Sequence, residues 1–196
     1  MVKKIKKLLI AGDSFAAKWP GADNGWVNLL EDDFSVTNIA QPGISEYKIL
    51  KQIEQVNLNL FDTVIVSHTS PSRIHTPNHP LHTEGFHHAC DLIASDLDGH
   101  FNPFNSSLTA AKMFFKYHYD EVYQQDIYNL IRSKINSLIT VPYISLSHVP
   151  IANDLRIESK HIDFSNLWIK ERGVVNHYTP TGNKLIYNDL KTIINE

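Results

Sequence analysis

The sequence predicts an α/β fold, a three-layer α/β/α sandwich whose parallel sheet has about five strands. Short apolar runs alternate with segments in which apolar residues recur at helical spacing, and this alternation is typical of a parallel sheet with helices on both faces. The chain has 196 residues, enough for one well-filled core, whereas two cores would each be small and marginal. We therefore expect a single domain over residues 1–196.

The first elements alternate between strand and helix. Apolar runs at 8–11, 35–40 and 62–66 predict three strands. Helical spacing predicts one helix near 26–30 and another that begins after Ser45 as its N-cap. Right-handed crossovers between such strands bring their carboxyl ends to one edge of the sheet.

A mostly helical insertion is expected at about 71–139. Its first part is rich in proline, histidine and asparagine, so it should leave the third strand as an irregular segment, followed by one helix over 86–97. Apolar and aromatic residues at 108–139 predict one long helix or two broken ones. A fourth strand at 143–146 and a last helix that begins at Pro180 complete the predicted fold.

Composition excludes several classes of function. The formal net charge is −3 and the basic residues are scattered, which does not favour nucleic acid as a partner. No apolar stretch reaches the roughly 18 residues that a membrane span needs. The single cysteine, Cys90, cannot form an intrachain disulfide, and we expect a reducing, cytoplasmic location.

The first chemical signal is Gly12-Asp13-Ser14, which directly follows the first predicted strand. A serine there projects above the carboxyl edge of the sheet, where open α/β sheets bind ligands. Its hydroxyl needs a nearby base to become a nucleophile. The best candidate is His177, in a loop that leads into the helix at Pro180.

These residues resemble motifs of the SGNH/GDSL hydrolase family, which has a flavodoxin-like hydrolase fold. Gly12 to Ser14 match its first block, His177 to Gly182 match its last, and Gly43 after the second strand matches its second. The resemblance implies a serine esterase that cleaves a carboxylic ester through an acyl-serine intermediate. Ser14 would attack, His177 would act as general base, and the backbone N–H groups of Ser14 and Gly43 would hold the oxyanion, with no metal or organic cofactor.

The third block departs from the family pattern. The family's asparagine is missing from the segment at 66–73. Thr69 and Ser70 are the preferred replacements as a third oxyanion donor, and His68 and Arg73 are further candidates. We also expect His68 and Arg73 to lie around the substrate.

The acidic partner of the histidine is also missing, because Val174 stands where the family has an acid. A Ser-His dyad is therefore expected, unless Glu171 or Asp163 reaches His177 through the fold. Beside the dyad, the residues expected around the substrate are Asp13, which should also stabilise its own loop, and Asn176.

Eleven histidines invite a metal hypothesis, which centres on five of them: His75, His79, His82, His87 and His88. They lack the spacing that fixes a zinc site. We therefore predict a polar loop without a bound metal, part of which lines the pocket.

Several alternatives stay open at this point. The resemblance implies an acetylated sugar, a lipid, a thioester or a short acyl ester as the substrate, and a small acyl group on a carbohydrate is preferred. The same dyad could instead transfer the acyl group to a sugar hydroxyl, or the altered blocks could mark a binding module with impaired catalysis. A homo-oligomer also stays open.

Overall fold

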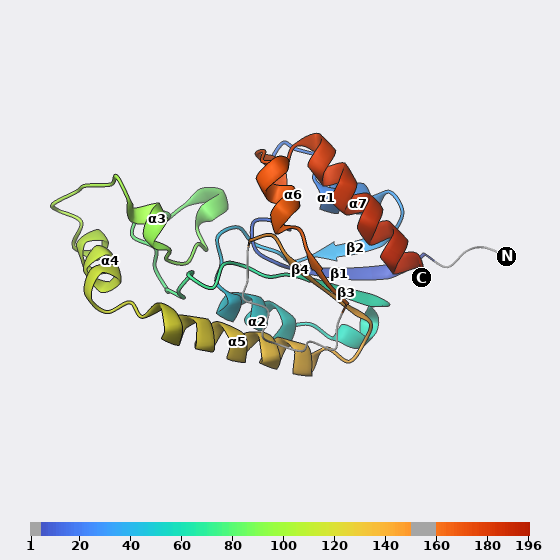
Figure 1. The fold of residues 1–196 in the computed structure, drawn as a ribbon, viewed down its shortest axis with the longest axis horizontal. Helices are drawn as coiled ribbons and strands as arrows, with labels where there is room; N and C mark the ends of the chain where they lie inside the picture. Colours follow the sequence, from blue (N-terminus) through green and yellow to red (C-terminus); the bar gives the residue numbers. More distant parts are fainter. Residues whose placement is uncertain (1–4, 150–159) are drawn as a thin grey trace.

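The computed structural model describes residues 5–149 and 160–196. The fold is α/β, with a five-stranded, all-parallel sheet in the order β2-β1-β3-β4-β5 (Figure 1). The strands are β1 (Lys7–Gly12), β2 (Ser35–Asn38), β3 (Thr63–Ser67), β4 (Tyr143–Ser147) and β5 (Lys160–Asp163). The predicted parallel α/β architecture is confirmed.

Helices lie on both faces of this sheet (Figure 1). They are α1 (Trp26–Glu31), α2 (Glu46–Glu54), α3 (Ala94–Leu97), α4 (Ser106–Tyr117), α5 (Glu121–Leu138), α6 (Ser165–Lys170) and α7 (Pro180–Asn195). The segment at 108–139 thus contains parts of two helices, one of the two arrangements that the sequence left open.

The continuous apolar run of β1 is explained by burial on both faces. Side chains alternate along a strand, so Leu8 and Ile10 enter the core under α1 and α7. Leu9 and Ala11 enter the core under α2 and α5. A strand covered on both faces needs apolar residues at every position.

The single helix predicted over 86–97 is wrong. The segment contains a 3₁₀ turn at Gly85–His87 and the short helix α3. Between them Leu92 pairs with Ile74, with N···O distances of 2.7 and 2.9 Å in the two directions. These long-range backbone bonds outweigh the local helical spacing.

Two elements near the C-terminus are absent from the sequence prediction, the edge strand β5 and helix α6. β5 has four residues and none of them is buried, so it lacks the apolar run that marks β1 and β3.

None of the described helices is long and apolar enough to span a bilayer.

The region around α3 and α4 extends away from the sheet (Figure 1). Its apolar contacts form a small cluster of their own, with Leu97, Leu108 and Ala111 as its buried members. This region is therefore not part of either main core.

Candidate functional site

Ser14 follows the end of β1, at the carboxyl edge of the sheet. Gly12 makes this turn possible, because its φ is +146° and a Cβ there would lie 2.5 Å from the Ser67 carbonyl oxygen. The Asp13 carboxylate accepts hydrogen bonds from the Phe15 N–H at 3.0 Å and the Ser67 hydroxyl at 3.3 Å. These contacts hold residues 13–15, which we call the serine loop, against β3.

His177 lies beside Ser14 although 163 residues separate them in the chain. Its Nε2 is 2.8 Å from the Ser14 Oγ. The predicted nucleophile and base are therefore brought together within hydrogen-bond distance.

The loop that carries His177 has an unusual backbone. Asn176 and His177 have φ values of 48° and 61°, in the left-handed region, which costs on the order of 1 kcal/mol or more for a residue other than glycine. Two amide side chains stabilise it: Asn176 donates to the Ala17 carbonyl at 2.8 Å, and Asn183 donates to the Val175 carbonyl at 3.1 Å. Asn176 is thus buried behind the site and fixes the loop that aims His177.

The imidazole of His177 is held in its neutral form. Burial, followed by the positive charges of Arg73 and Arg172, lowers its pKa to about 4. The ring packs against Phe15, at a centroid distance of 4.5 Å, and against the edge of Trp19, at 5.5 Å. A neutral ring can accept the serine proton.

Neither acidic side chain considered from the sequence is bonded to His177. Among the residues that the structure describes, the hydrogen bond to this ring comes from Ser14. Glu171 instead bonds the Thr179 hydroxyl, and Asp163 bonds the Ser165 N–H at 2.8 Å. Val174 is 74% exposed.

Gly43 lies next to the serine loop because pairing with β1 continues past β2. The Gln41 N–H donates to the Gly12 carbonyl at 3.0 Å. Gly43 lies two residues after Gln41, and Ser14 lies two residues after Gly12, so both follow this hydrogen-bonded pair at the same edge of the sheet. Gly43 has a φ of +69°, and a Cβ there would lie 2.2 Å from the Cys90 Sγ. Only glycine fits this position without displacement.

The segment after β3 is largely used to support the site. Thr69 is 2% exposed; its N–H donates to Glu46 at 3.3 Å and its carbonyl accepts from the Tyr128 hydroxyl at 3.1 Å. Ser70 is half-buried, and its hydroxyl accepts the Ser72 N–H at 3.3 Å. The role of either as an oxyanion donor stays a prediction.

His68 lies in a buried polar network that the sequence did not reveal. Its Nδ1 is 2.6 Å from the Glu46 carboxylate and its Nε2 is 3.0 Å from the Tyr143 hydroxyl. The three residues come from three elements far apart in the chain, so no local pattern signals their contact. His68 supports the β3 loop and is 1% exposed.

The carboxyl group of Asp13, next to Ser14, has a strongly shifted pKa. Burial raises its pKa to about 7, against the opposing effect of the Phe15 N–H, Arg73 and a Thr69 side-chain hydrogen bond. Its carboxyl group is therefore close to its titration point at neutral pH. Arg73, a further predicted site residue, donates a hydrogen bond from its guanidinium to the Asp91 carbonyl at 2.9 Å.

Two of the five clustered histidines come together with an acid. One candidate ligand atom from each of His79, His82 and Asp96 lies within 4.8 Å of the others. However, the His79 Nδ1 accepts the N–H groups of Leu81 and His82, both at 3.1 Å. With Nδ1 accepting these bonds, the neutral ring has its proton on Nε2, which is buried without a hydrogen-bond partner among the described residues. A metal ion at Nε2 would require this proton to be lost.

No family model, no curated protein and no solved structure matches the chain. The fold and the site define it as an α/β protein with a serine-histidine pair at the carboxyl edge of a parallel sheet.

Proposed function

We propose that the chain is a serine esterase of the SGNH/GDSL kind, which cleaves a carboxylic ester through an acyl-serine intermediate. The observation that carries the proposal is the distance of 2.8 Å between the Ser14 Oγ and the His177 Nε2. The position of the Ser14–His177 pair supports the same proposal, since ligands of open α/β sheets bind at the carboxyl ends of the strands.

The first half of the reaction forms the acyl-enzyme. As the Ser14 Oγ attacks the ester carbonyl carbon, its proton moves to the His177 Nε2. The N–H groups of Ser14 and Gly43 stabilise the oxyanion, and such a donor is typically worth about 3 kcal/mol. When the tetrahedral intermediate collapses, the alcohol leaves with the proton from the imidazolium.

The second half regenerates the serine. His177 takes a proton from water, the resulting hydroxide attacks the acyl carbon, and the carboxylic acid leaves as Ser14 recovers its proton. Each step uses the dyad and backbone donors.

The surroundings of His177 favour a slow enzyme. A buried imidazole with a pKa of about 4 is a weak base. Replacing the acid of a complete triad costs about 10⁴-fold in rate. We therefore expect turnover well below that of a triad esterase.

We further propose that the ester is an acyl group on a carbohydrate. Trp19 bonds the Ser14 carbonyl through its Nε1 at 3.2 Å, and its ring lies 5.3 Å from that of Phe86. Both aromatic side chains are partly exposed, and such apolar rings beside polar groups suit the face of a sugar. Transfer to a sugar hydroxyl is tested by adding acceptor sugars to the same assay.

The proposal is tested by hydrolysis of p-nitrophenyl acetate and of an acetylated monosaccharide. Wild-type protein should hydrolyse at least one of them, whereas Ser14→Ala and His177→Ala should each lose about 10²-fold or more in kcat/KM. Ser107→Ala, an exposed serine on α4, should match the wild type. Equal rates for Ser14→Ala and wild type would reject the proposed function.

A further inference from the structure

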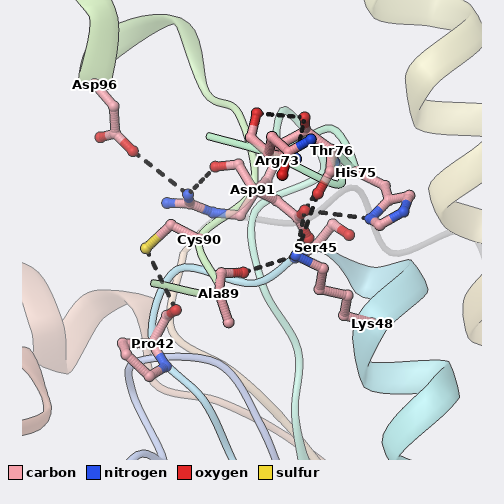
Figure 2. A network of polar contacts seen from close by, with 11 residues as sticks. Pro42, Ser45, Lys48, Arg73, His75, Thr76, Ala89, Cys90, Asp91 and Asp96 are labelled. Carbon is pink, nitrogen blue, oxygen red and sulfur yellow. Dashed lines mark hydrogen bonds and ion pairs between the residues drawn. The ribbon is translucent and has the colours of Figure 1, made fainter. Parts of the chain in front are cut away.

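A buried carboxylate outside the dyad lies behind the Gly43 loop. The Asp91 residue is fully buried, and Figure 2 shows it at the centre of a network of polar contacts. Among the described residues, its side-chain oxygens contact four donors: the Ser45 N–H at 2.7 Å, the Thr76 N–H at 2.8 Å, the Lys48 Nζ at 2.8 Å and the His75 Nδ1 at 3.2 Å. This carboxylate therefore joins the start of α2 to the segment after β3.

Asp91 contacts the Gly43 loop from two directions. Its backbone N–H donates to the Gly43 carbonyl at 2.8 Å, while its carboxylate accepts the Ser45 N–H. Both contacts lie on the C-terminal side of Gly43 and bracket Ile44, so Asp91 restrains the chain as it leaves the turn in which Gly43 has its positive φ.

The residue before Asp91 fixes the other peptide of Gly43. The Cys90 Sγ lies 3.5 Å from the Pro42 carbonyl oxygen. The Pro42 C=O and the Gly43 N–H belong to one planar trans peptide and point in opposite directions. Together, residues 90 and 91 hold both peptide planes that flank Gly43, and so they set the direction of its N–H.

The charge of Asp91 is matched to this task. A buried carboxylate is stable only if it is paired and hydrogen-bonded, and here Lys48 supplies the opposite charge at 2.8 Å. Truncating the side chain would leave buried N–H donors, including that of Ser45, without their acceptor. The Gly43 loop would then be free to relax away from its present conformation.

We propose that Asp91 is a positioning residue that aims the Gly43 N–H at the oxyanion. This inference rests on the proposed function. Because an oxyanion donor acts on the transition state, Asp91 should affect kcat much more than KM.

The test compares Asp91→Ala and Asp91→Asn with a matched control, Asp96→Asn. Asp96 lies 3.5 Å from the same Arg73 guanidinium that bonds the Asp91 carbonyl, but it has no contact with the Gly43 loop among the described residues. The measurements are kcat and KM for the ester, the Kd of an alkyl boronic acid, whose adduct with Ser14 imitates the tetrahedral intermediate, and the thermal unfolding of each variant.

We expect Asp91→Ala to lower kcat about 10- to 100-fold, less than or equal to the loss of a whole donor, with KM changed less than about threefold. Boronate affinity should fall by the same factor as kcat/KM. Asp91→Asn keeps one acceptor oxygen and should fall between wild type and Asp91→Ala, while Asp96→Asn should match the wild type.

Four results would overturn the inference: an unchanged kcat in Asp91→Ala, an effect on KM alone, an equal loss in Asp96→Asn, or failure of both Asp91 variants to fold. The last result would make Asp91 a residue required for folding. Failure of the proposed function looks different, because in that case Ser14→Ala would hydrolyse the ester at the wild-type rate.

Discussion

At the residue scale, His177 combines a strained backbone with a desolvated side chain. Its φ is 61°, in a loop that buried amides hold, and burial, followed by the positive charges of Arg73 and Arg172, lowers its pKa to about 4. The left-handed backbone positions the ring, and burial keeps it neutral. In the proposed reaction, His177 would therefore be a well-placed but weak base.

This base predicts an unusual pH dependence. Activity requires the neutral imidazole, so kcat/KM should fall only as the pH drops through about 4 and not near 6.5. Initial rates measured over a series of pH values give this acid limb of the profile. At each pH, the enzyme is returned to neutral pH to show that it regains its full activity. Asp13→Asn is the control, because the limb near 4 should persist when the carboxyl group with a pKa near 7 is removed. An acid limb at pH 6.5 or above in both proteins would show that a neutral His177 with a pKa near 4 is not the base.

Asp13 makes a separate prediction about stability. Its pKa rises from 3.8 to about 7 on folding, so between these values the folded state binds a proton that the unfolded state has lost. The stability that this proton contributes is present below about pH 4 and is lost as the pH rises towards 7, by up to about 4 kcal/mol.

Asp13→Asn should remove that pH dependence. Urea unfolding at pH 5 and pH 8 should show the variant gaining stability relative to wild type at the higher pH. If the free energies of unfolding of wild type and Asp13→Asn differ by the same amount at both pH values, the Asp13 carboxyl group does not titrate with a pKa near 7.

At the element scale, the loop after β2 is a tightly fitted part of the site. Gly43→Ala puts a Cβ 2.2 Å from the Cys90 Sγ at a φ of +69°. We expect kcat to fall about 10²-fold, since the oxyanion N–H is displaced. The double variant Gly43→Ala/Cys90→Ala removes the Sγ clash but leaves the backbone strain and loses the Cys90 contact with the Pro42 carbonyl. It should therefore recover part of the activity lost in Gly43→Ala but stay below Cys90→Ala alone. Full wild-type activity in Gly43→Ala would show that this loop does not have the proposed role.

Sequence patterns predicted the elements whose signals are local. The apolar run of β1 and the proline at the start of α7 each indicate their structure within a few residues. The same is true of Ser14 and His177, which both lie next to such elements. By contrast, the short edge strand β5 has no buried residue, and the segment at 86–97 is held by bonds to Ile74 and Gly43 that no local pattern encodes.

The supporting groups of the site could not be predicted for the same reason. Glu46 and Asp91 are ordinary polar residues in the sequence, and their buried partners lie about 15 to 50 residues away in the chain. Sequence spacing finds residues that share an element, whereas these networks depend on how three elements meet.

At the scale of the whole molecule, stability should be uneven. The sheet has large cores on both faces, whereas α3 and α4 share a small cluster. Phe101 and Phe104 in the same region are 87% and 95% exposed. Regions with few buried apolar contacts open at low free energy.

Hydrogen exchange should therefore divide the molecule. Amides of α4 should exchange much faster than those of α2 and α5, which pack on the sheet. Exchange followed by mass spectrometry compares the peptides directly. Equal protection of α4 and α5 would contradict this description of the fold.

The fold brings Ser14 and His177, 163 residues apart in the chain, within hydrogen-bond distance. Covalent labelling tests most directly whether they are the proposed nucleophile and base. The protein is treated with a fluorophosphonate, digested and analysed by mass spectrometry. We expect one adduct, on Ser14, with no labelling of Ser14→Ala and labelling of His177→Ala slowed by about 10²-fold or more. An unlabelled wild type, or an adduct on another residue, would contradict the assignment of Ser14 as the nucleophile.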